Sequence, residues 1–270
     1  MTLEEKYAAL IAAIAATRRA AVAFSGGVDS SLLCHAAVRA LGADALAITL
    51  VSPMLARSEL EWARRVARHT GIHHILLEDA TIENEVAQNT KDRCYYCKKI
   101  EFGAIIKKAR ETGAETVLDG SNADDERDYR PGLRAVAELA IRSPLRELRF
   151  SKAEIRELSM REGLPTWDKP AHACLASRFP YGERIDAEKL HQVEAAEAVL
   201  REAGFVNFRV RYHGNIARLE VAPDERRRFF DEAVLDQIAG RIRQCGFLYV
   251  AFELSGYRMG SLNAALGSGA

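Results

Sequence analysis

A short segment near the start of the chain, Ser25-Gly-Gly-Val-Asp-Ser-Ser31, constrains the fold more than any other stretch. It follows the apolar run 20–24, which is typical of a buried strand, and it opens a helix expected at about 29–41. Two glycines let the backbone approach an anion without a Cβ in the way. The unpaired N–H groups and positive dipole end of a helix N-terminus attract phosphate oxygens. The segment therefore predicts a phosphate-binding turn rather than an ordinary strand-to-helix connection.

The side chains of this turn narrow the class of phosphate site. No Gly-Lys-Ser/Thr follows, as a Walker A loop would need, and the Gly-x-Gly-x-x-Gly of a dinucleotide site is missing from the turn. The hydroxyls of Ser25, Ser30 and Ser31 can add hydrogen-bond donors. Asp29 is out of place beside phosphate unless a divalent cation lies between them.

Strand-like apolar runs alternate with helical periods through the first two thirds of the chain. The expected strands cover 20–24, 45–51, 74–77 and 116–118, and the helices between them cover 29–41, 58–70 and 97–112. Strands separated by helices indicate a parallel sheet with helices on both faces. Ligands of such sheets bind at the carboxyl ends of the strands. We therefore expect an α/β fold.

The pattern changes in a stretch rich in Pro, Gly and small residues between 164 and 183. A capping box, Ser151-Lys-Ala-Glu154, opens the last helix before it. Beyond it we expect a helix at 187–202, strands at 206–212 and 216–221, a helix at 223–244 and a strand at 247–254. The sequence thus predicts a first domain at 1–178 and a smaller α+β domain at 179–270.

Composition excludes several classes of protein. Of the 270 residues, 48% are hydrophobic, which is enough for one large domain or two smaller ones. Positive and negative side chains balance to a net charge of zero, so no global field draws the protein to nucleic acid or to an anionic membrane. No run reaches the roughly 18 apolar residues of a membrane span.

The first twenty residues are expected to form an amphipathic helix rather than a targeting segment. Glu4, Glu5 and Lys6 break the charge order that a signal peptide needs. We therefore expect a cytoplasmic protein that acts on a small molecule, without a membrane or a stable nucleic-acid partner.

Five cysteines without an export signal indicate reduced thiols, metal ligands or thiol chemistry rather than disulfides. Cys94-Tyr-Tyr-Cys97 has the spacing of a metal hairpin or a redox pair, at a helix start where the dipole lowers thiol pKa values. Cys174 is the obvious third thiol. Three thiolates suit a 4Fe-4S cluster with one open iron, whereas three thiolates with His172 suit zinc, and both alternatives stay open. Cys34 and Cys245 are expected to be buried or incidental thiols.

The glycine turn closely resembles the PP-loop, Ser-Gly-Gly-x-Asp-Ser, of the ATP-pyrophosphatases. These enzymes bind ATP and release pyrophosphate when they form an adenylate. The resemblance assigns ATP and pyrophosphate binding to Ser25, Gly26, Gly27, Asp29, Ser30 and Ser31. The stretches 119–125 and 143–156 resemble segments near the nucleotide in that family. Asp124, in the first of them, is expected to bind Mg²⁺ together with Asp29.

Over nearly its whole length the chain is similar to the LarE family, a branch of the PP-loop enzymes that makes the nickel-pincer nucleotide cofactor of lactate racemase. Besides the PP-loop, the resemblance rests on Asp119-Gly-Ser-Asn122, Asp128-Tyr-Arg-Pro-Gly132, Ser177-Arg-Phe-Pro-Tyr-Gly182, Arg209-Val-Arg-Tyr-His213 and Gly256-Tyr-Arg258. It implies the substrate pyridinium-3,5-biscarboxylic acid mononucleotide. ATP would adenylate each carboxylate, and sulfur would then replace AMP to give a thiocarboxylate.

Members of this family obtain the sulfur in two ways. Some sacrifice one cysteine, which becomes dehydroalanine, and others hold a 4Fe-4S cluster on three cysteines and carry sulfide on its open iron. Cys94, Cys97 and Cys174 match the three-cysteine pattern. The resemblance therefore predicts the cluster and gives these three thiols the catalytic role.

The implied substrate carries a phosphate and two carboxylates, which guanidinium groups suit. The residues that resemble the family's substrate contacts are Lys98, Ser177, Arg178, Arg209, Arg211 and Arg258. Arg209 and Arg211 alternate along one strand and therefore point to the same face, where Glu220 of the next strand is expected to orient them. The family also implies a homo-oligomer, commonly a hexamer.

Three alternatives compete with this interpretation. A PP-loop tRNA thiolase would need an RNA surface, which zero net charge does not favour. An ammonia-dependent PP-loop synthetase would leave the three cysteines without a role. A zinc- or cluster-stabilised binding module would account for the cysteines but not for the glycine turn.

Overall fold

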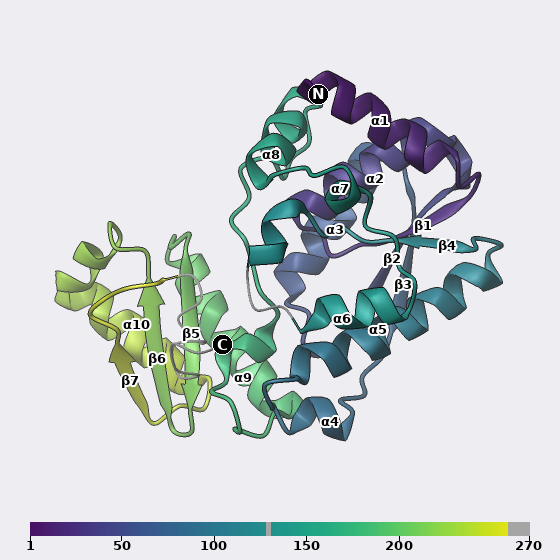
Figure 1. The fold of residues 1–270 in the computed structure, drawn as a ribbon. Coiled ribbons are helices and arrows are strands. Elements are labelled where there is room, and N and C mark those ends of the chain that lie inside the picture. Colours follow the sequence, from purple (N-terminus) through teal and green to yellow (C-terminus); the bar gives the residue numbers. More distant parts are fainter. Residues whose placement is uncertain (128–130, 259–270) are drawn as a thin grey trace. The chain divides into compact units, whose positions relative to one another are not determined.

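A computed structural model describes residues 1–127 and 131–258 and groups them into two compact units (Figure 1). The first unit contains residues 1–81 and 94–172, and the second contains residues 82–93 and the chain from Ala173 onward. The predicted boundary lay after residue 178. In the structure, residues 82–93 and 173–178 belong to the second unit instead of the first. Within the described ranges no helix is long and apolar enough to cross a bilayer.

The first unit is built on a four-stranded parallel sheet, as predicted. Its strands are β1 (Ala20–Ala23), β2 (Ala45–Val51), β3 (His73–Glu78) and β4 (Thr116–Leu118), in the order β3-β2-β1-β4. Ala20 is paired with Ala45 on one side and with Thr116 on the other. The chain runs from β1 through β2 to β3 and then returns to place β4 on the opposite side of β1. The carboxyl ends of β1 and β4 therefore form a topological switch point, where ligands of such sheets bind.

Successive residues of β1 and β2 point to opposite faces of the sheet, and each face carries its own core. Ala20, Val22 and Ala47 belong to the core under α1 (Leu3–Ala15), α2 (Val28–Leu41), α3 (Arg57–Thr70) and α8 (Lys152–Arg161). Ala21 and Leu46 belong to the core under α5 (Arg93–Glu111) and α6 (Gly132–Glu138). Helices therefore cover both faces, and the edge formed by the strand ends is the place left for a ligand.

Side-chain caps fix where several helices begin. The predicted capping box is confirmed, because the Ser151 hydroxyl accepts from the Glu154 N–H and Glu154 accepts from the Ser151 N–H. Thr2 and Glu5 form a second box at the start of α1. The shorter elements of this unit are α7 (Pro144–Glu147) and 3₁₀ turns at Gly42–Asp44 and Ala123–Arg127. Helix α5 begins at Arg93, four residues earlier than expected, so the cysteine pair lies within its first turns.

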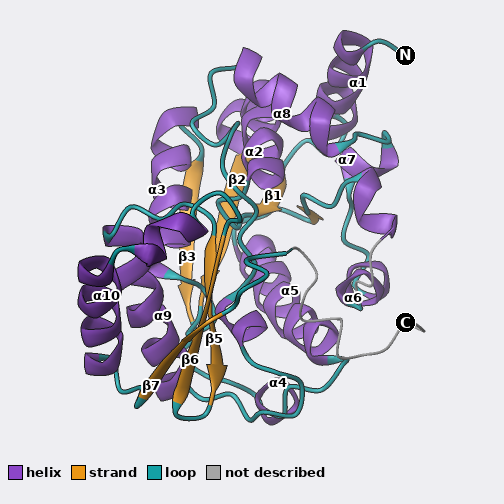
Figure 2. Ribbon diagram, turned by 90° about the vertical axis from the view of Figure 1, so that its left-hand side faces the viewer, coloured by secondary structure: helices purple, strands orange, loops and turns teal. Residues whose placement is uncertain are grey.

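The second unit is a small α+β structure. Strands β5 (Phe208–His213) and β6 (Ile216–Val221) are antiparallel, and β7 (Tyr249–Phe252) is parallel to β6. Helices α9 (Ala187–Glu202) and α10 (Glu232–Gln244) lie side by side along this sheet (Figure 2). The helix expected at 223–244 is wrong in its first part, which is a 3₁₀ turn at Arg226–Phe230. The Asp231 carboxylate accepts from two backbone N–H groups and starts α10 there.

Residues 82–93, which include α4 (Asn84–Ala87), join the second unit through hydrogen bonds to 176–185. Gly182 N–H donates to the Asn89 carbonyl over 3.0 Å, and Ile185 N–H donates to the Ala87 carbonyl over 2.8 Å. The Asn89 side chain is fully buried and donates to the Pro180 carbonyl over 2.7 Å. The twelve residues 82–93 thus stabilise the segment that follows Cys174.

Candidate active site

The glycine turn 25–31, which resembles a PP-loop, lies at the switch point directly after β1. Gly27 is the N-cap of α2, and the first hydrogen bond of the helix runs from Ser31 N–H to the Gly27 carbonyl over 2.9 Å. The N–H groups of Val28, Asp29 and Ser30 precede that bond and have no carbonyl partner inside the helix. This helix end is suited to binding an anion.

Two glycines let neighbouring backbone approach this turn closely. Gly26 has a φ of +73°, and a Cβ there would lie 2.8 Å from the N of Ala63 and the O of Glu59 in α3. A Cβ on Gly120, after β4, would lie 2.9 Å from the Ser30 nitrogen. The turn is therefore packed between α3 and the β4 end, and neither glycine position has room for a side chain.

The three serines of the turn have different surroundings. The Ser31 side chain is fully buried and its hydroxyl donates to the Gly27 carbonyl over 2.7 Å. Ser30 is also buried, and its oxygen lies 3.2 Å from both the Gly27 carbonyl and the Ser25 hydroxyl. Ser25 is exposed. Ser25 thus presents its hydroxyl at the surface, while the Ser31 hydroxyl holds the turn together.

The two acidic residues predicted to bind Mg²⁺ both contact Lys152. Asp29 Oδ2 lies 2.5 Å from Lys152 Nζ, and Asp29 Oδ1 accepts from Asn122 Nδ2 over 3.3 Å. Asp124 Oδ2 accepts from the Lys152 backbone N–H over 2.7 Å. No group of three or more His, Cys, Asp or Glu side chains in the described chain is arranged to hold a metal ion. Mg²⁺ commonly takes one or two carboxylates together with phosphates, and binding of this ion by Asp29 and Asp124 stays a prediction.

A buried carboxylate supports the same edge of the sheet from behind. Asp119 is 7% exposed and accepts from the hydroxyls of Ser121 and Ser143, each over 2.5 Å. Asn122 N–H donates to Asp125 over 3.0 Å. The stretches 119–125 and 143–156 were predicted to lie near the nucleotide, but Asn122, Ser143 and Lys152 had no predicted role, because their roles depend on contacts between distant segments.

Cys94 and Cys97 lie three residues apart in α5, on the same side of the helix. Cys94 is exposed and Cys97 is half-buried. Desolvation by burial favours a lower pKa for Lys98, but Glu101, 2.8 Å away, outweighs it, and Cys97 and Asp119 add to the effect. The pKa of Lys98 is therefore raised above its ordinary value. Lys98 thus lies within electrostatic reach of both the cysteine pair and the β4 end.

Cys174 belongs to the second unit, where it is exposed and caps a 3₁₀ turn at Leu175–Arg178. Its carbonyl accepts from the Ser177 N–H over 3.0 Å and from Arg178 Nη1 over 3.1 Å. Arg178 is 1% exposed and pairs with Glu197 through two bonds of 2.8 and 3.0 Å. Arg93, the residue before Cys94, donates to the Ala176 carbonyl over 2.9 Å. Two buried guanidinium groups thus hold the Cys174 turn.

All five cysteines lie in the described chain, and none forms a disulfide. Burial raises the pKa of the Cys34 thiol well above its ordinary value, which makes Cys34 a poor ligand or nucleophile. Cys245 donates to the Arg241 carbonyl within α10. These two surroundings are those of structural thiols, as expected.

The predicted substrate residues of the second unit form a network of buried charges. Arg209 and Arg211 are 3% and 6% exposed. Arg211 Nη2 lies 2.8 Å from Glu220, so the expected contact between these strands is present, and Nη1 donates to the Ser177 carbonyl over 2.8 Å. Arg209 lies over the Tyr257 ring, 4.7 Å from its centre. Burial, and then Arg178, lowers the pKa of Arg209.

The other motif residues are placed as follows. Arg258 is exposed at the end of the described chain. Asp128 lies outside the described residues. The structure assigns no ligand to Lys98, Ser177, Arg178, Arg209, Arg211 or Arg258, so their role as substrate contacts stays a prediction.

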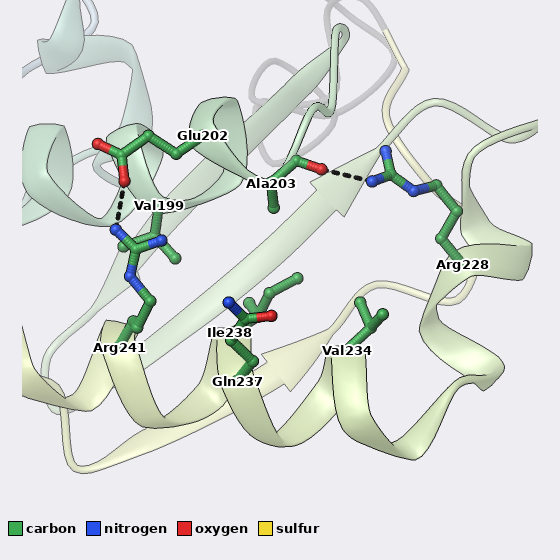
Figure 3. Close-up of a pocket in the computed structure, with 8 residues that line it drawn as sticks. All are labelled: Val199, Glu202, Ala203, Arg228, Val234, Gln237, Ile238 and Arg241. Atoms are coloured by element: carbon green, nitrogen blue, oxygen red, sulfur yellow. Dashed lines mark hydrogen bonds and ion pairs between the residues drawn. The ribbon is translucent and has the colours of Figure 1, made fainter.

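A separate cavity of about 130 Å³ lies between α9 and α10 (Figure 3). Arg241 pairs with Glu202 there, and Arg228 donates to the Ala203 carbonyl. None of the predicted site residues lines this cavity. Its arginines tie α9 to the chain around α10, which is a structural role.

Comparisons with known proteins agree with the geometry of the turn. Residues 7–127 match the family described as asparagine synthase. The chain is 45% identical over 249 residues to an uncharacterised protein of Synechocystis sp., covering 92% of this chain and 93% of that protein. It is 33% identical to a tRNA-specific 2-thiouridylase of Bradyrhizobium sp., over 67% of this chain and 56% of that protein.

A relative that is named as an enzyme aligns with almost the entire chain. Pyridinium-3,5-bisthiocarboxylic acid mononucleotide synthase of Lactiplantibacillus plantarum is 38% identical over 271 residues, which cover 98% of this chain and 96% of the synthase. At this identity over nearly the full length of both chains, the protein belongs to the LarE family of PP-loop enzymes.

Proposed function

We propose that this protein is an ATP-dependent sulfur transferase that converts the carboxylates of pyridinium-3,5-biscarboxylic acid mononucleotide to thiocarboxylates. The observation that carries the proposal is the first turn of α2, whose N–H groups face the switch point of a sheet in a chain that aligns over 98% of its length with the synthase. ATP and a small nucleotide are its substrates, and the product belongs to the synthesis of the nickel-pincer cofactor.

The first half of the reaction is adenylation. A substrate carboxylate oxygen attacks the α-phosphorus of ATP, the bond from that phosphorus to the β-bridging oxygen breaks, and pyrophosphate leaves. The amides of Gly27 to Ser30 bind the departing pyrophosphate, where backbone donors stabilise the growing negative charge. Asp29 and Asp124 would hold the Mg²⁺ ion, whose charge offsets that of the phosphates.

The second half is sulfur transfer. A carboxylate is a poor electrophile, but its adenylate carries AMP as a good leaving group. A sulfur nucleophile at the oxidation level of sulfide attacks the acyl carbon, a C–S bond forms, the C–O bond to AMP breaks, and a thiocarboxylate remains. Each carboxylate consumes one ATP.

Buried guanidinium groups of the second unit support anion recognition. Glu197 fixes Arg178 and Glu220 fixes Arg211, so these planar donors are oriented before the substrate arrives. Lys98, Ser177, Arg209 and Arg258 complete the proposed substrate set. Arg178 also holds the carbonyls of Ala173 and Cys174, which supports a second role in positioning the Cys174 turn.

Cys94, Cys97 and Cys174 are the residues that would hold a 4Fe-4S cluster. Cys94 and Cys174 are exposed and Cys97 is half-buried, so their thiols are accessible in the way that ligands require, in contrast to Cys34. When bound, such a cluster would supply sulfur at the oxidation level of sulfide for the transfer step. The same exposed Cys174 also fits the sacrificial alternative, in which its own sulfur is used.

The activity is tested with anaerobically reconstituted protein, ATP and the biscarboxylic nucleotide. We expect AMP, pyrophosphate and a thiocarboxylate, identified by chromatography and mass spectrometry. If the wild-type protein forms no AMP with this substrate, the proposed function is wrong.

The sulfur source is tested separately by intact mass and by iron content. A chain that loses the elements of hydrogen sulfide at Cys174 after one turnover would contradict the cluster. Cys94→Ala should abolish iron binding and the visible iron–sulfur absorbance while ATP still binds, and Cys245→Ala should change neither. Iron retained by Cys94→Ala would contradict the ligand assignment.

A PP-loop tRNA thiolase is the second candidate, because of the similarity to tRNA-specific 2-thiouridylase over 67% of this chain. The zero net charge favours it less. Binding of tRNA at moderate salt, with thiolation of a base, would support this candidate over the first.

A further inference from the structure

A buried lysine, distant in sequence from the PP-loop, donates a hydrogen bond to the backbone of this loop. The Lys169 side chain is 3% exposed, and its Nζ donates to the Gly26 carbonyl over 2.8 Å. The same ammonium lies 2.8 Å from Glu59 Oε2 and 5.2 Å from the centre of the Trp62 ring. All of these residues belong to the first unit.

The segment that carries Lys169 is itself fixed. Arg156 of α8 donates to the Trp167 carbonyl over 2.7 Å and to the Lys169 carbonyl over 2.8 Å. Lys169 N–H donates to the Thr166 carbonyl over 3.1 Å. The backbone of Lys169 is therefore held in place by hydrogen bonds, so the position of its ammonium group beside the PP-loop is fixed.

A bond to the Gly26 carbonyl sets the direction of the next amide. In a trans peptide the C=O of one residue and the N–H of the following residue point in opposite directions. The Gly26–Gly27 peptide is trans, so a donor fixed on the Gly26 oxygen turns the Gly27 N–H away from Lys169. Gly27 is the N-cap of α2, and its N–H precedes the row of helix-end amides.

Glu59 completes the arrangement from α3. Its carboxylate partly neutralises the buried ammonium, and its backbone oxygen is one of the atoms against which Gly26 packs. Burial lowers the pKa of Lys169, and Glu59 opposes this effect. The Lys169–Glu59 ion pair thus contributes to the position of the loop and to the direction of its first amide.

We propose that Lys169 is a positioning residue for the pyrophosphate part of ATP, because it holds the Gly26–Gly27 peptide with its N–H directed at the anion. This inference rests on the proposed ATP-dependent function and adds to it a residue that makes no contact with the substrate itself. Lys169 acts on the β- and γ-phosphates through the loop and leaves the adenosine part unaffected.

The test compares ATP with AMP, because AMP lacks the phosphates that the loop is proposed to hold. Dissociation constants are measured by calorimetry for the wild type and for Lys169→Met, with inorganic pyrophosphate as a third ligand. We expect Lys169→Met to weaken ATP and pyrophosphate about tenfold, which corresponds to about 1.4 kcal/mol, and to leave AMP within about twofold. Lys108→Met, which removes a surface partner of Glu111 in the same unit, is the matched control.

Lys169→Arg keeps a cationic donor and should bind ATP more tightly than Lys169→Met. If Lys169→Met does not fold, as judged by circular dichroism, the ratio of ATP to AMP affinity in Lys169→Arg decides the question. ATP affinity equal to that of the wild type, or equal losses for ATP and AMP, would overturn the positioning role. A wild-type protein that binds no ATP would instead refute the proposed function.

Discussion

Lys152 and Asp29 form an ion pair, with 2.5 Å between Nζ and Oδ2, at the start of two helices that are far apart in the sequence. The backbone N–H of the same lysine donates to Asp124 Oδ2. One residue thus contacts both carboxylates that are proposed to hold Mg²⁺. A cation bound at Oδ2 would take the place of the Lys152 ammonium, so we expect lysine and metal to be alternative partners of this oxygen.

Replacing Lys152 with Met should make ATP binding more dependent on Mg²⁺. Without the metal, Asp29 would face the phosphates unneutralised, and we expect the affinity for ATP to fall about tenfold. With excess Mg²⁺ the ion replaces the missing ammonium, and the loss should be about threefold or less. Calorimetry with EDTA and with Mg²⁺ measures both. Arg161→Met, in the same helix but paired at the surface with Glu4, is the control. Equal losses in the two buffers would contradict this exchange.

Replacing Gly120 by any other residue should impair the site, because Gly120 packs against the backbone N–H groups at the start of α2. A Cβ at this position would lie 2.9 Å from the Ser30 nitrogen, and that atom is backbone and cannot turn away. Gly120→Ala should cost about 1–3 kcal/mol of unfolding free energy and weaken ATP binding by at least about tenfold. Denaturant titration and calorimetry measure the two effects.

The control for this prediction is Gly103→Ala. Gly103 lies within α5 with no atom near the new Cβ, so alanine should stabilise the helix by about 0.5–1 kcal/mol and leave ATP binding unchanged. Normal ATP affinity in Gly120→Ala would show that the close approach of the two backbones is not needed for the site.

The parts of the fold that follow local patterns could be predicted from the sequence. The four strands of the first sheet and the PP-loop turn are confirmed, because a buried apolar run followed by Gly-Gly and a helix start is recognisable within one short window. The predicted helix 223–244 is wrong at its start. The composition of 223–231 is compatible with a helix, but the Asp231 carboxylate accepts from two backbone N–H groups, so α10 begins only after this residue.

The contacts that assemble the site could not be predicted in this way. Lys169 reaches Gly26 across 143 positions, and Lys152 reaches Asp29 across 123. Neither lysine differs in its local sequence from a solvated surface residue. Residues 82–93 join the second unit through backbone carbonyls and two buried side chains, Asn89 and Arg93, which no periodicity indicates.

His74 should make the stability of the first unit depend on pH. Its Nε2 lies 2.8 Å from the Thr49 hydroxyl, and burial, then Arg64, lowers its pKa from 6.5 to about 4. Between these pH values the unfolded chain binds a proton that the folded chain does not bind. The free energy of unfolding therefore falls as the pH is lowered through this window, by about 1–2 kcal/mol because solvent screens this half-buried group.

Denaturant titrations of the wild type and of His74→Gln at pH 7 and pH 5 check this prediction. The glutamine variant should lose less stability than the wild type between the two pH values. His69→Gln, at an exposed position in α3, should behave as the wild type does. The same pH dependence in His74→Gln and the wild type would assign the effect to another group.

Neutralising the Glu197 carboxylate should strongly lower the stability of the second unit. Glu197 is 2% exposed and accepts from Arg178 and from the Val210 N–H. Burial alone would raise the pKa of Glu197, but Arg178 outweighs burial and lowers it. Glu197→Gln leaves the buried guanidinium without its counter-charge, which typically costs about 3–5 kcal/mol.

Glu197→Gln should also increase the mobility of the Cys174 turn. Arg178, which Glu197 orients, donates hydrogen bonds to the carbonyls of Ala173 and Cys174. We expect faster amide hydrogen exchange over residues 173–178 and a denaturation midpoint clearly below that of the wild type. Glu202→Gln, in the same helix but paired at the surface with Arg241, should cost less than about 1 kcal/mol. If Glu197→Gln unfolds with a normal midpoint while exchange at 173–178 is unchanged, Arg178 does not depend on this carboxylate. The hydrogen bonds from Arg178 to the carbonyls of Ala173 and Cys174 would then be sufficient to order the Cys174 turn.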